Sequence, residues 1–562
     1  MMGPKTTWQA IADILATEGV RHLFGLPGNP RQLYEALLDH PEITPVLVRE
    51  ESSGGFMAHA YARVTNGPAV CFGSPAPGVA NLVPAIMEAQ VACLPLIALG
   101  AAAPQSTLGQ GAFQECDQLG MMRPVTKWAW RITSPERAPW AMRRAFHLAT
   151  SGQPGPVYVE VPSDVGLAQP EMPTYRPVPR PLRPAGDEEA VKAIADLLCQ
   201  AEHPLLLVGG GGLLSGAQDE VQALAEKWRL ALATTPGGRG IIHEDHPLAL
   251  GLTGLYFNPV CAGAFAQTDP VLVIGSRLER FQASGWTILP EGARLVQVDI
   301  EPFEIGRSYV ADAAVISDAR LVLRQLLAAL WKRLSPDSLP WREWSSSLAE
   351  AKAAYLSEVA QECRTEELPI RTKRIVCELG HTFGPETILV NENGSQDLWT
   401  YYVPYYRGRQ GGLCVPLGEH TCLGLGVAGA IGAKLARPEK RVVCATGDGA
   451  FHTEMKELPT AVQYSAPVSW VVLDKRSFGW PKLHERRGGW QRYIAVDFEA
   501  QPDFAAVARA SGCYGERVEL PAEITPALHR ALEANNSGDP PVLHFIVDDT
   551  EFGRGFRAQY RL

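Results

Sequence analysis

Short apolar runs alternate with amphipathic, helix-like stretches along most of the chain. In the first third of the chain the apolar runs lie at 22–25, 46–49, 68–73, 95–100 and 155–162. Alternation at this rhythm is typical of βαβ units and predicts a doubly wound, mostly parallel sheet. The pattern starts again near Asp187 and once more near Arg371. We therefore expect an α/β fold with three doubly wound parallel-sheet domains.

Prolines and charged residues mark the breaks between these three patterns. The stretch 170–184 is rich in proline, which predicts an extended linker. A charged, helix-like stretch follows the second pattern at 341–364. The expected organisation is an N-terminal domain at 1–169, a linker at 170–186, a central domain at 187–335, a helical linker at 336–368, a C-terminal domain at 369–547 and a tail at 548–562.

Composition narrows the class of protein. A chain of 562 residues with 46% hydrophobic and 20% charged residues is typical of a globular protein with several cores. The net charge of −10 argues against nucleic acid as a partner. The most apolar stretch, 78–103, is interrupted by Glu88, Gln90 and prolines, which argues against a membrane span. The 11 scattered cysteines, without any C-x-x-C pair, and the lack of a signal-peptide pattern favour reduced thiols and a cytoplasmic protein.

The most informative stretch is 441–480. A buried-strand pattern at 442–445 is followed by Gly447-Asp448-Gly449, and a second strand pattern lies at 468–473. Ligands of parallel α/β sheets sit at the carboxyl ends of the strands. Glycines there let backbone N–H groups approach a phosphate, and an Asp between them is an oxygen ligand suited to Mg²⁺. Gly-Asp-Gly alone is more often a tight turn, so the spacing to other motifs decides between these interpretations.

This stretch resembles the cofactor motif of thiamine-diphosphate (ThDP)-dependent decarboxylases and carboligases. In that family a pair of asparagines follows Gly-Asp-Gly at the end of the next strand, and here the pair is replaced by Asp474-Lys475, with Lys475 at 27 residues after Asp448. The resemblance covers nearly the whole chain and is closest to the group of acetolactate synthase, benzoylformate decarboxylase and benzaldehyde lyase. The other matching stretches are 24–28 (FGLPG), 49–51 (REE), 60–63 (AYAR), 77–81 (PGVAN) and 112–117 (AFQECD).

The resemblance implies roles for individual residues. Glu51 would bond the aminopyrimidine of ThDP and activate it, Gln114 would contact the intermediate or acceptor, and Leu423 would be wedged between the two cofactor rings. The implied cofactor-binding residues are Pro27, Glu51, Asn81, Gly394, Ser395, Gln396, Thr421, Leu423, Gly447, Asp448, Gly449, Ala450 and Lys475. The implied substrate pocket contains Asn29, Gly73, Ser74, Gln114, Trp480 and His484. Surface or interface aromatics are the alternative interpretation of Trp480 and His484.

Lys475 is the main departure from the family pattern, because a charged ammonium has donors only and cannot bind a metal. Three explanations are open. The ammonium substitutes for part of the metal charge beside the diphosphate; Mg²⁺ binds through Asp448, the Ser477 carbonyl, phosphates and extra water; or Asp474 becomes the ligand after a local shift. We expect a weakened Mg²⁺ site with Asp448 and Ser477 as its protein ligands.

The resemblance implies a ThDP-dependent lyase or transferase that decarboxylates a 2-oxoacid without oxidation and joins the product to an aldehyde or second 2-oxoacid. The polar active-site residues of related decarboxylases are missing. Asn29 stands in place of a serine, and Gly73-Ser74 and Gln114-Glu115 stand in the regions of the histidines. Without such proton relays a carboligase is favoured over a dedicated decarboxylase. The alternatives are a benzoylformate decarboxylase-like or benzaldehyde lyase-like enzyme on aromatic substrates, and a ThDP-binding protein without turnover.

The resemblance also bears on assembly and on a second cofactor. It implies a homodimer or homotetramer whose active sites lie between chains. In the central pattern, four glycines at 209–212 follow a strand but lack the full dinucleotide spacing. The stretch 275–281 resembles a segment of acetolactate synthases, which hold FAD on this domain. FAD is therefore one alternative, and a structural domain without a cofactor is the expectation.

Overall fold

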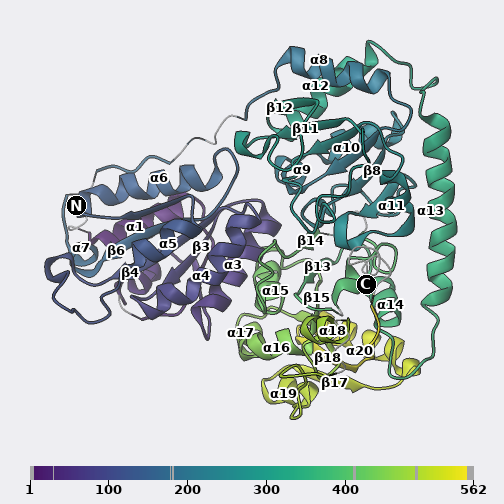
Figure 1. Ribbon diagram of the computed structural model, residues 1–562. Helices are drawn as coiled ribbons and strands as arrows, with labels where there is room; N and C mark the ends of the chain where they lie inside the picture. The colour runs from purple at the N-terminus through teal and green to yellow at the C-terminus, as the bar shows by residue number, and fades with distance from the viewer. Residues whose placement is uncertain are drawn as a thin grey trace.

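The computed structural model describes residues 5–28, 31–171, 173–177, 179, 183–395, 397–408, 413–487 and 492–552. It contains three α/β units, each built on a six-stranded sheet, and the pairings within the sheets are parallel (Figure 1). The expected fold class, α/β with three doubly wound parallel sheets, is confirmed. In the described part of the chain, none of the helices combines the length and apolar character needed to cross a membrane.

The N-terminal sheet has the strand order β2-β1-β3-β4-β6-β5. Its strands are β1 (His22–Gly25), β2 (Thr44–Leu47), β3 (Ala69–Gly73), β4 (Leu96–Ala102), β5 (Trp128–Arg131) and β6 (Val157–Pro162). Its helices are α1 (Thr7–Thr17), α2 (Gln32–Ala36), α3 (Glu51–Thr65), α4 (Pro77–Val91), α5 (Gln118–Met122), α6 (Ala138–Thr150) and α7 (Ser163–Leu167). The apolar run expected at 46–49 ends earlier, with β2, so that Glu51 is the first residue of a helix.

The central sheet has the order β12-β11-β10-β7-β8-β9. Its strands are β7 (Leu205–Val208), β8 (Ala231–Thr234), β9 (Ala249–Leu252), β10 (Val271–Ile274), β11 (Leu295–Asp299) and β12 (Ala313–Ile316). Its helices are α8 (Glu188–Cys199), α9 (Gly210–Ser215), α10 (Gln218–Glu226), α11 (Pro259–Phe265) and α12 (Ala319–Trp331). Counted within the unit this is the 3-2-1-4-5-6 order of dinucleotide-binding folds, with the switch point between β7 and β10.

The C-terminal sheet has the order β14-β13-β15-β16-β18-β17, which repeats the order of the N-terminal sheet. Its strands are β13 (Ile388–Asn391), β14 (Leu413–Val415), β15 (Val442–Gly447), β16 (Val468–Asp474), β17 (Tyr514–Val518) and β18 (Pro541–Ile546). Its helices are α14 (Thr372–Phe383), α15 (Leu425–Ala436), α16 (Asp448–Glu454), α17 (Leu458–Gln463), α18 (Gly479–Arg487), α19 (Phe504–Ala510) and α20 (Ile524–Ser537). The long helix α13 (Arg342–Glu362) runs along the outer side of the central and C-terminal units (Figure 1).

The N-terminal and C-terminal units share one hydrophobic core, and the contact between α3 and α15 is its centre. The two helices approach closely because glycines on α15 face α3. A Cβ at Gly432 would overlap the carbonyl oxygen of Met57, and a Cβ at Gly429 would lie 3.2 Å from the Cβ of Ala60. This close packing places the beginning of α3 against the C-terminal unit.

One pair of cysteines forms a disulfide, although reduced thiols were expected. Cys363, after the end of α13, and Cys377 on α14 form a disulfide with a Cα–Cα distance of 6.2 Å. The prediction that the thiols are all reduced is therefore wrong for this pair. The bond ties the outer helix to the C-terminal unit, a long-range pairing that cysteine spacing alone does not reveal.

Candidate active site

Glu51 is held in place by two polar residues from neighbouring elements. It is the first residue of α3 and its exposed fraction is 5%. One carboxylate oxygen accepts a hydrogen bond from Asn81 Nδ2 on α4 at 3.1 Å, and the other accepts one from Ser74 Oγ at 3.4 Å. Ser74 directly follows β3, so three of the predicted site residues meet at the carboxyl edge of the N-terminal sheet.

Two glycines make this cluster compact. A Cβ at Gly78, near the start of α4, would lie 2.7 Å from the Glu51 carboxylate. A Cβ at Gly73, the last residue of β3, would lie 2.8 Å from the backbone of Gly78. Because both positions are glycines, the end of β3 and the start of α4 pack closely around Glu51. This packing keeps Ser74 and Asn81 within hydrogen-bond distance of the Glu51 carboxylate.

Asp448 lies at the equivalent edge of the C-terminal sheet, directly after β15. One of its oxygens accepts hydrogen bonds from Ser477 N at 3.2 Å and Gln501 Nε2 at 3.1 Å. The other, Oδ1, is buried without a hydrogen-bond partner among the described residues. A Cβ on the preceding Gly447 would meet no atom within 4 Å other than its chain neighbours, so there is open space beside Gly447. Burial raises the pKa of Asp448 to about 7, and the nearby Lys475 ammonium opposes the shift.

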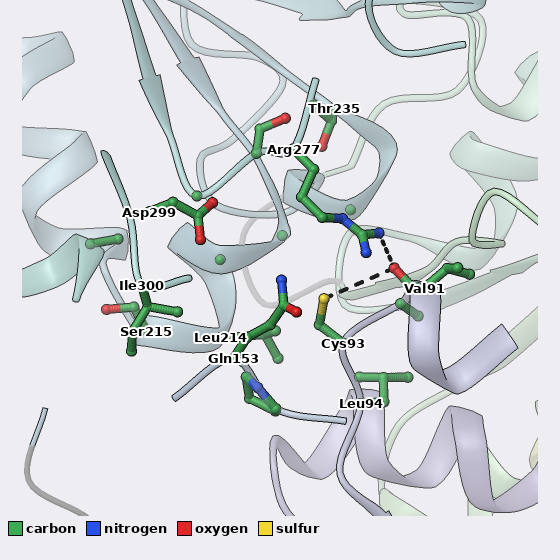
Figure 2. Close-up of a pocket in the computed structure, with 18 of the residues that line it drawn as sticks. Val91, Cys93, Leu94, Gln153, Leu214, Ser215, Thr235, Arg277, Asp299 and Ile300 are labelled. Atoms are coloured by element: carbon green, nitrogen blue, oxygen red, sulfur yellow. Dashed lines mark hydrogen bonds between the residues drawn. The ribbon is translucent and has the colours of Figure 1, made fainter. Parts of the chain in front are cut away.

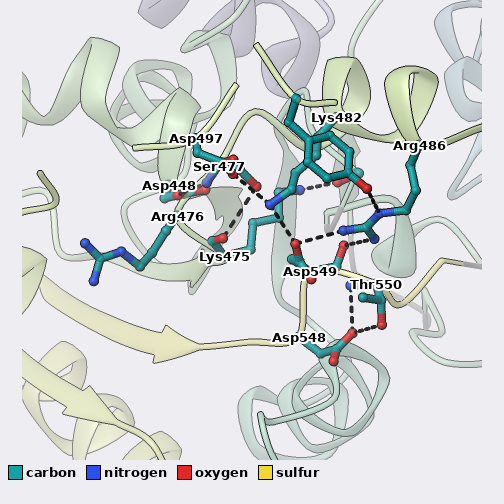
Figure 3. Close-up of polar contacts among 12 residues, drawn as sticks. Asp448, Lys475, Arg476, Ser477, Lys482, Arg486, Asp497, Asp548, Asp549 and Thr550 are labelled. Atoms are coloured by element: carbon teal, nitrogen blue, oxygen red, sulfur yellow. Dashed lines mark hydrogen bonds and ion pairs between the residues drawn. The ribbon is translucent and has the colours of Figure 1, made fainter. Parts of the chain in front are cut away.

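Lys475 and Ser395 complete the second cluster. The Lys475 ammonium donates a hydrogen bond to Ser395 Oγ, and both side chains are buried. A Cβ on Gly479, the first residue of α18, would overlap both groups. Figure 3 shows Lys475 beside Asp448 and Ser477.

Asp474, the neighbour of Lys475, is engaged elsewhere. Its Oδ2 lies 2.8 Å from His544 Nε2, and its Oδ1 accepts from Arg476 N at 2.8 Å and from Gln501 at 3.1 Å. Moving this carboxylate to serve as a metal ligand would break these bonds.

The loop before α15, which contains Thr421 and Leu423, is held by two carboxylates that the sequence analysis did not identify. Glu392, just after β13, accepts hydrogen bonds from four backbone N–H groups at 2.7–3.1 Å, including those of Gly424 and Gly426. Burial raises the pKa of Glu392 to about 7, and these backbone bonds oppose the shift. The only sequence signal for it is its position at the end of a strand.

The second of these carboxylates belongs to the N-terminal unit. Glu88 on α4 accepts from Gly418 N and from Cys422 N, the latter at 3.4 Å. Leu423 is half-buried within the held segment, and the Thr421 carbonyl accepts a hydrogen bond from Asn393 Nδ2 at 2.8 Å. Glu88 of the N-terminal unit and Glu392 of the C-terminal unit thus both hold the loop, which lies at the boundary between these units.

A buried hydrogen bond joins α3, which begins with Glu51, to α16, which begins with Asp448. Ser53 Oγ on α3 donates to Glu454 Oε2 at 2.6 Å, and burial raises the pKa of Glu454 to about 7. Glu454 ends α16 and Asp448 begins it, so the two lie about 9 Å apart along the helix. The helix that starts with Glu51 therefore rests against the helix that starts with Asp448.

The remaining predicted residues are less tightly tied to these clusters. Gln114 is half-buried in the loop before α5, has φ of 58°, and no described hydrogen bond joins it to Glu51. Pro27 is exposed after β1, Gly394 follows β13, and Gly449 and Ala450 are buried in the first turn of α16. Asn29 and Gln396 lie outside the described residues.

The two aromatic candidates on α18 have different surroundings. Trp480 is half-buried against an aromatic cluster that includes Tyr401 and Tyr402, whereas His484 is exposed. The helix itself is anchored by Lys482, which lies 2.7 Å from Asp497 (Figure 3). Trp480 thus packs against the core of this unit.

The central unit carries a separate cavity of about 180 Å³ at its boundary with the N-terminal unit. Its lining follows the carboxyl ends of β7, β10, β11 and β12, where Gly210, Gly275, Asp299 and Asp318 lie. Figure 2 shows Asp299, Gln153 and Arg277 around this cavity. A Cβ on Gly275, whose φ is 61°, would overlap the backbone of the glycine run at 210–212.

Each of the three units matches a domain of a known protein family. Residues 5–121 match the N-terminal TPP binding domain of thiamine pyrophosphate (ThDP) enzymes, residues 191–326 match their central domain, and residues 393–545 match their C-terminal TPP binding domain. A probable acetolactate synthase large subunit from Methanocaldococcus jannaschii is 32% identical, covering 97% of this chain and 92% of its own. An acetolactate synthase from Mycobacterium leprae is 30% identical over 96% of this chain and 86% of its own. The chain therefore belongs to the acetolactate synthase-like family of ThDP-dependent enzymes.

Proposed function

We propose that this protein is a lyase or transferase that decarboxylates a 2-oxoacid without oxidation and joins the resulting fragment to an aldehyde or 2-oxoacid acceptor. The observation that carries the proposal is Glu51, a buried carboxylate fixed by Asn81 and Ser74 at the start of α3. A protein that only stores ThDP would not need a carboxylate held in this way.

ThDP supplies the carbanion chemistry when it is bound. The chain contributes positioning and proton transfer. Asn81 and Ser74 orient the Glu51 carboxylate, which would hold or release a proton beside the pyrimidine ring. Leu423 and the Thr421 carbonyl, on the clamped loop, would hold the cofactor rings, and Ser395 with Lys475 would hold the diphosphate.

The surroundings of Glu51 favour carboligation over simple decarboxylation. The described side chains that hydrogen-bond to Glu51 are an amide and a hydroxyl, and neither is a good proton donor near neutral pH. A dedicated decarboxylase needs a general acid to protonate its intermediate. A carboligase instead passes that intermediate to a second carbonyl, with Gln114 as the candidate contact.

A divalent cation fits the second cluster poorly. Its protein ligands would be the Asp448 carboxylate and the Ser477 carbonyl, and the third family position holds the Lys475 ammonium. In the described part of the chain, no group of three or more His, Cys, Asp or Glu side chains is arranged to hold a metal ion. The chemistry proposed here therefore includes no step at a metal.

The central cavity supports a nucleotide cofactor, with FAD as the candidate. The sheet has the strand order of dinucleotide-binding folds, and the cavity lies at its switch point. Asp299 ends β11 beside the cavity, and an acid near this edge commonly binds a ribose. Fluorescence of the supernatant after heat denaturation of the purified protein tests whether a flavin is released.

The oligomeric state is proposed from membership of the same family. We propose a cytoplasmic homodimer or homotetramer with active sites between chains. Within one chain Ser53 on α3 donates to Glu454 on α16; active sites between chains additionally require that Glu51 of one copy and Asp448 of another face the same cofactor. Light scattering coupled to size-exclusion chromatography measures the mass, and a monomer that turns over substrate would contradict active sites shared between chains.

The test of function is Glu51→Gln. We expect the rate of CO₂ release from a panel of aliphatic and aromatic 2-oxoacids to fall about 100-fold or more, because proton transfer by a positioned carboxyl is lost. ThDP binding should change little. Glu50→Gln is the matched control, since the neighbouring Glu50 side chain is 39% exposed and pairs with Lys456 rather than with Asn81 or Ser74.

Three outcomes separate the alternatives. Activity of Glu51→Gln within a few-fold of wild type would overturn the assignment of Glu51. Turnover confined to aromatic 2-oxoacids would favour the benzoylformate decarboxylase-like function. ThDP binding without turnover by the wild-type protein would identify a non-catalytic binding protein.

A further inference from the structure

The second cluster brings together side chains from three adjacent strands of the C-terminal sheet. Ser395 follows β13, Asp448 follows β15 and Lys475 follows β16, and these strands are neighbours in the order β13-β15-β16. The three side chains are buried, with exposed fractions of 2%, 1% and 8%. A buried ammonium requires compensating partners, because an unpaired charge in the interior is strongly disfavoured.

The partners of Lys475 identify what it can bind. Its ammonium donates to Ser395 Oγ, and Lys475 lies beside Asp448 at the ends of the neighbouring strands β16 and β15 (Figure 3). Asp448 Oδ1 is buried without a described hydrogen-bond partner, and open space adjoins Gly447. The cluster therefore offers one fixed cation and one hydroxyl at the edge of an open space, a combination that suits a phosphate group.

The same arrangement disfavours a divalent cation. A metal ion bound by Asp448 would lie beside the Lys475 ammonium, and like charges at short range repel strongly in a site without water. Asp474 could ligate a metal ion only by breaking its bonds to His544, Gln501 and Arg476 N.

The absence of a side chain at Gly479 leaves room for the Lys475 ammonium. Any Cβ at this position would overlap both Lys475 Nζ and Ser395 Oγ. The start of α18 therefore accommodates the ammonium in its buried position, so that Lys475 stays inside the site.

We propose that the Lys475 ammonium takes the place of the divalent cation in this protein, so that the diphosphate of ThDP binds directly to Lys475 and Ser395 without a metal ion. Asp448 acts as the counter-charge that holds the ammonium in position. The proposal rests on ThDP being the cofactor, as in the proposed function. It makes Lys475 a cofactor-binding residue and Asp448 a positioning residue.

The experiment is calorimetric titration of ThDP into metal-free protein, in EDTA and in Mg²⁺. For the wild-type protein we expect dissociation constants within about twofold of each other, since no metal is needed. For Lys475→Asn, which restores an oxygen ligand, we expect binding in EDTA to weaken at least about tenfold, because a charge-assisted hydrogen bond to phosphate is lost. Mg²⁺ should then restore it.

Two further variants sharpen the result. Lys475→Met removes the charge without offering a ligand, so ThDP should bind weakly in both buffers. Lys440→Asn is the control, since Lys440 pairs with Glu386 at the surface and should leave both dissociation constants unchanged. Circular dichroism checks that each variant folds.

The wild-type titration is decisive even if a variant fails to fold. Binding of ThDP by the wild-type protein only in Mg²⁺ would overturn the proposal and leave the cofactor assignment intact. No binding in either buffer would overturn both the proposal and the proposed function.

Discussion

Ser53→Ala tests whether the hydrogen bond between α3 and α16 stabilises the contact between the N-terminal and C-terminal units. Ser53 and Glu454 are both buried, and their oxygens are 2.6 Å apart. Removing the hydroxyl leaves the Glu454 carboxylate without this donor. A hydrogen bond to a charged group contributes about 1.5–3 kcal/mol, and one between neutral groups about 0.5–1.5 kcal/mol.

The pH dependence follows from the state of Glu454. Burial raises its pKa from 4.5 to about 7, so the carboxyl is neutral at pH 6 and ionised at pH 8. A carboxyl whose pKa is raised by folding reduces stability as the pH rises from its unfolded value to its folded value. The variant should therefore lose about 1.5–3 kcal/mol of local stability at pH 8 and about 1 kcal/mol at pH 6.

Amide hydrogen exchange across α3 and α16 measures these local opening free energies. Ser357→Ala is the matched control, because Ser357 is exposed on α13 and its hydroxyl bonds only within that helix, to Ala353 O. We expect the control to change local stability by less than about 0.5 kcal/mol. An effect of Ser53→Ala equal to that of the control, or larger at pH 6 than at pH 8, would refute the reasoning.

Two further predictions concern the boundary between the N-terminal and C-terminal units. Gly432→Ala should destabilise the protein by about 1–3 kcal/mol, because the added methyl overlaps the backbone of α3. Gly263→Ala on α11 should be neutral or stabilising, since a Cβ there meets no atom within 4 Å, and thermal denaturation compares the two. Glu88→Gln should weaken ThDP binding about tenfold, because one backbone N–H of the loop 418–422 loses its acceptor. Glu386→Gln, 70% exposed, should leave titrations unchanged, and equal affinities for the two variants would contradict the role of Glu88.

The periodicity of the chain was enough to predict the architecture. Apolar runs separated by amphipathic stretches require parallel strands covered by helices, and three such patterns became three six-stranded sheets. Motif spacing was enough to select Glu51, Asn81, Asp448 and Lys475, because the residues of each motif lie within one or two neighbouring elements. Motifs of this kind can be identified from the sequence without knowledge of long-range contacts.

The helical position of Glu51 was not predicted correctly. The apolar run before it suggested a strand end, whereas β2 stops at Leu47 and Glu51 opens α3. The boundary depends on where the helix begins relative to its packing partner α15, and element ends are the least certain part of a sequence-based assignment.

By itself the amino-acid sequence determined the three-sheet fold, the ThDP motifs and the replacement at Lys475. Only the tertiary structure decided that Glu88 and Glu392 clamp the loop before α15, that Ser53 bonds Glu454, and that Lys475 bonds Ser395. The partners in three of these contacts are 80 to 401 positions apart, and no local period relates them. Such contacts exist because helices and strand ends from different units are packed into one core, and burial then makes each polar partner necessary.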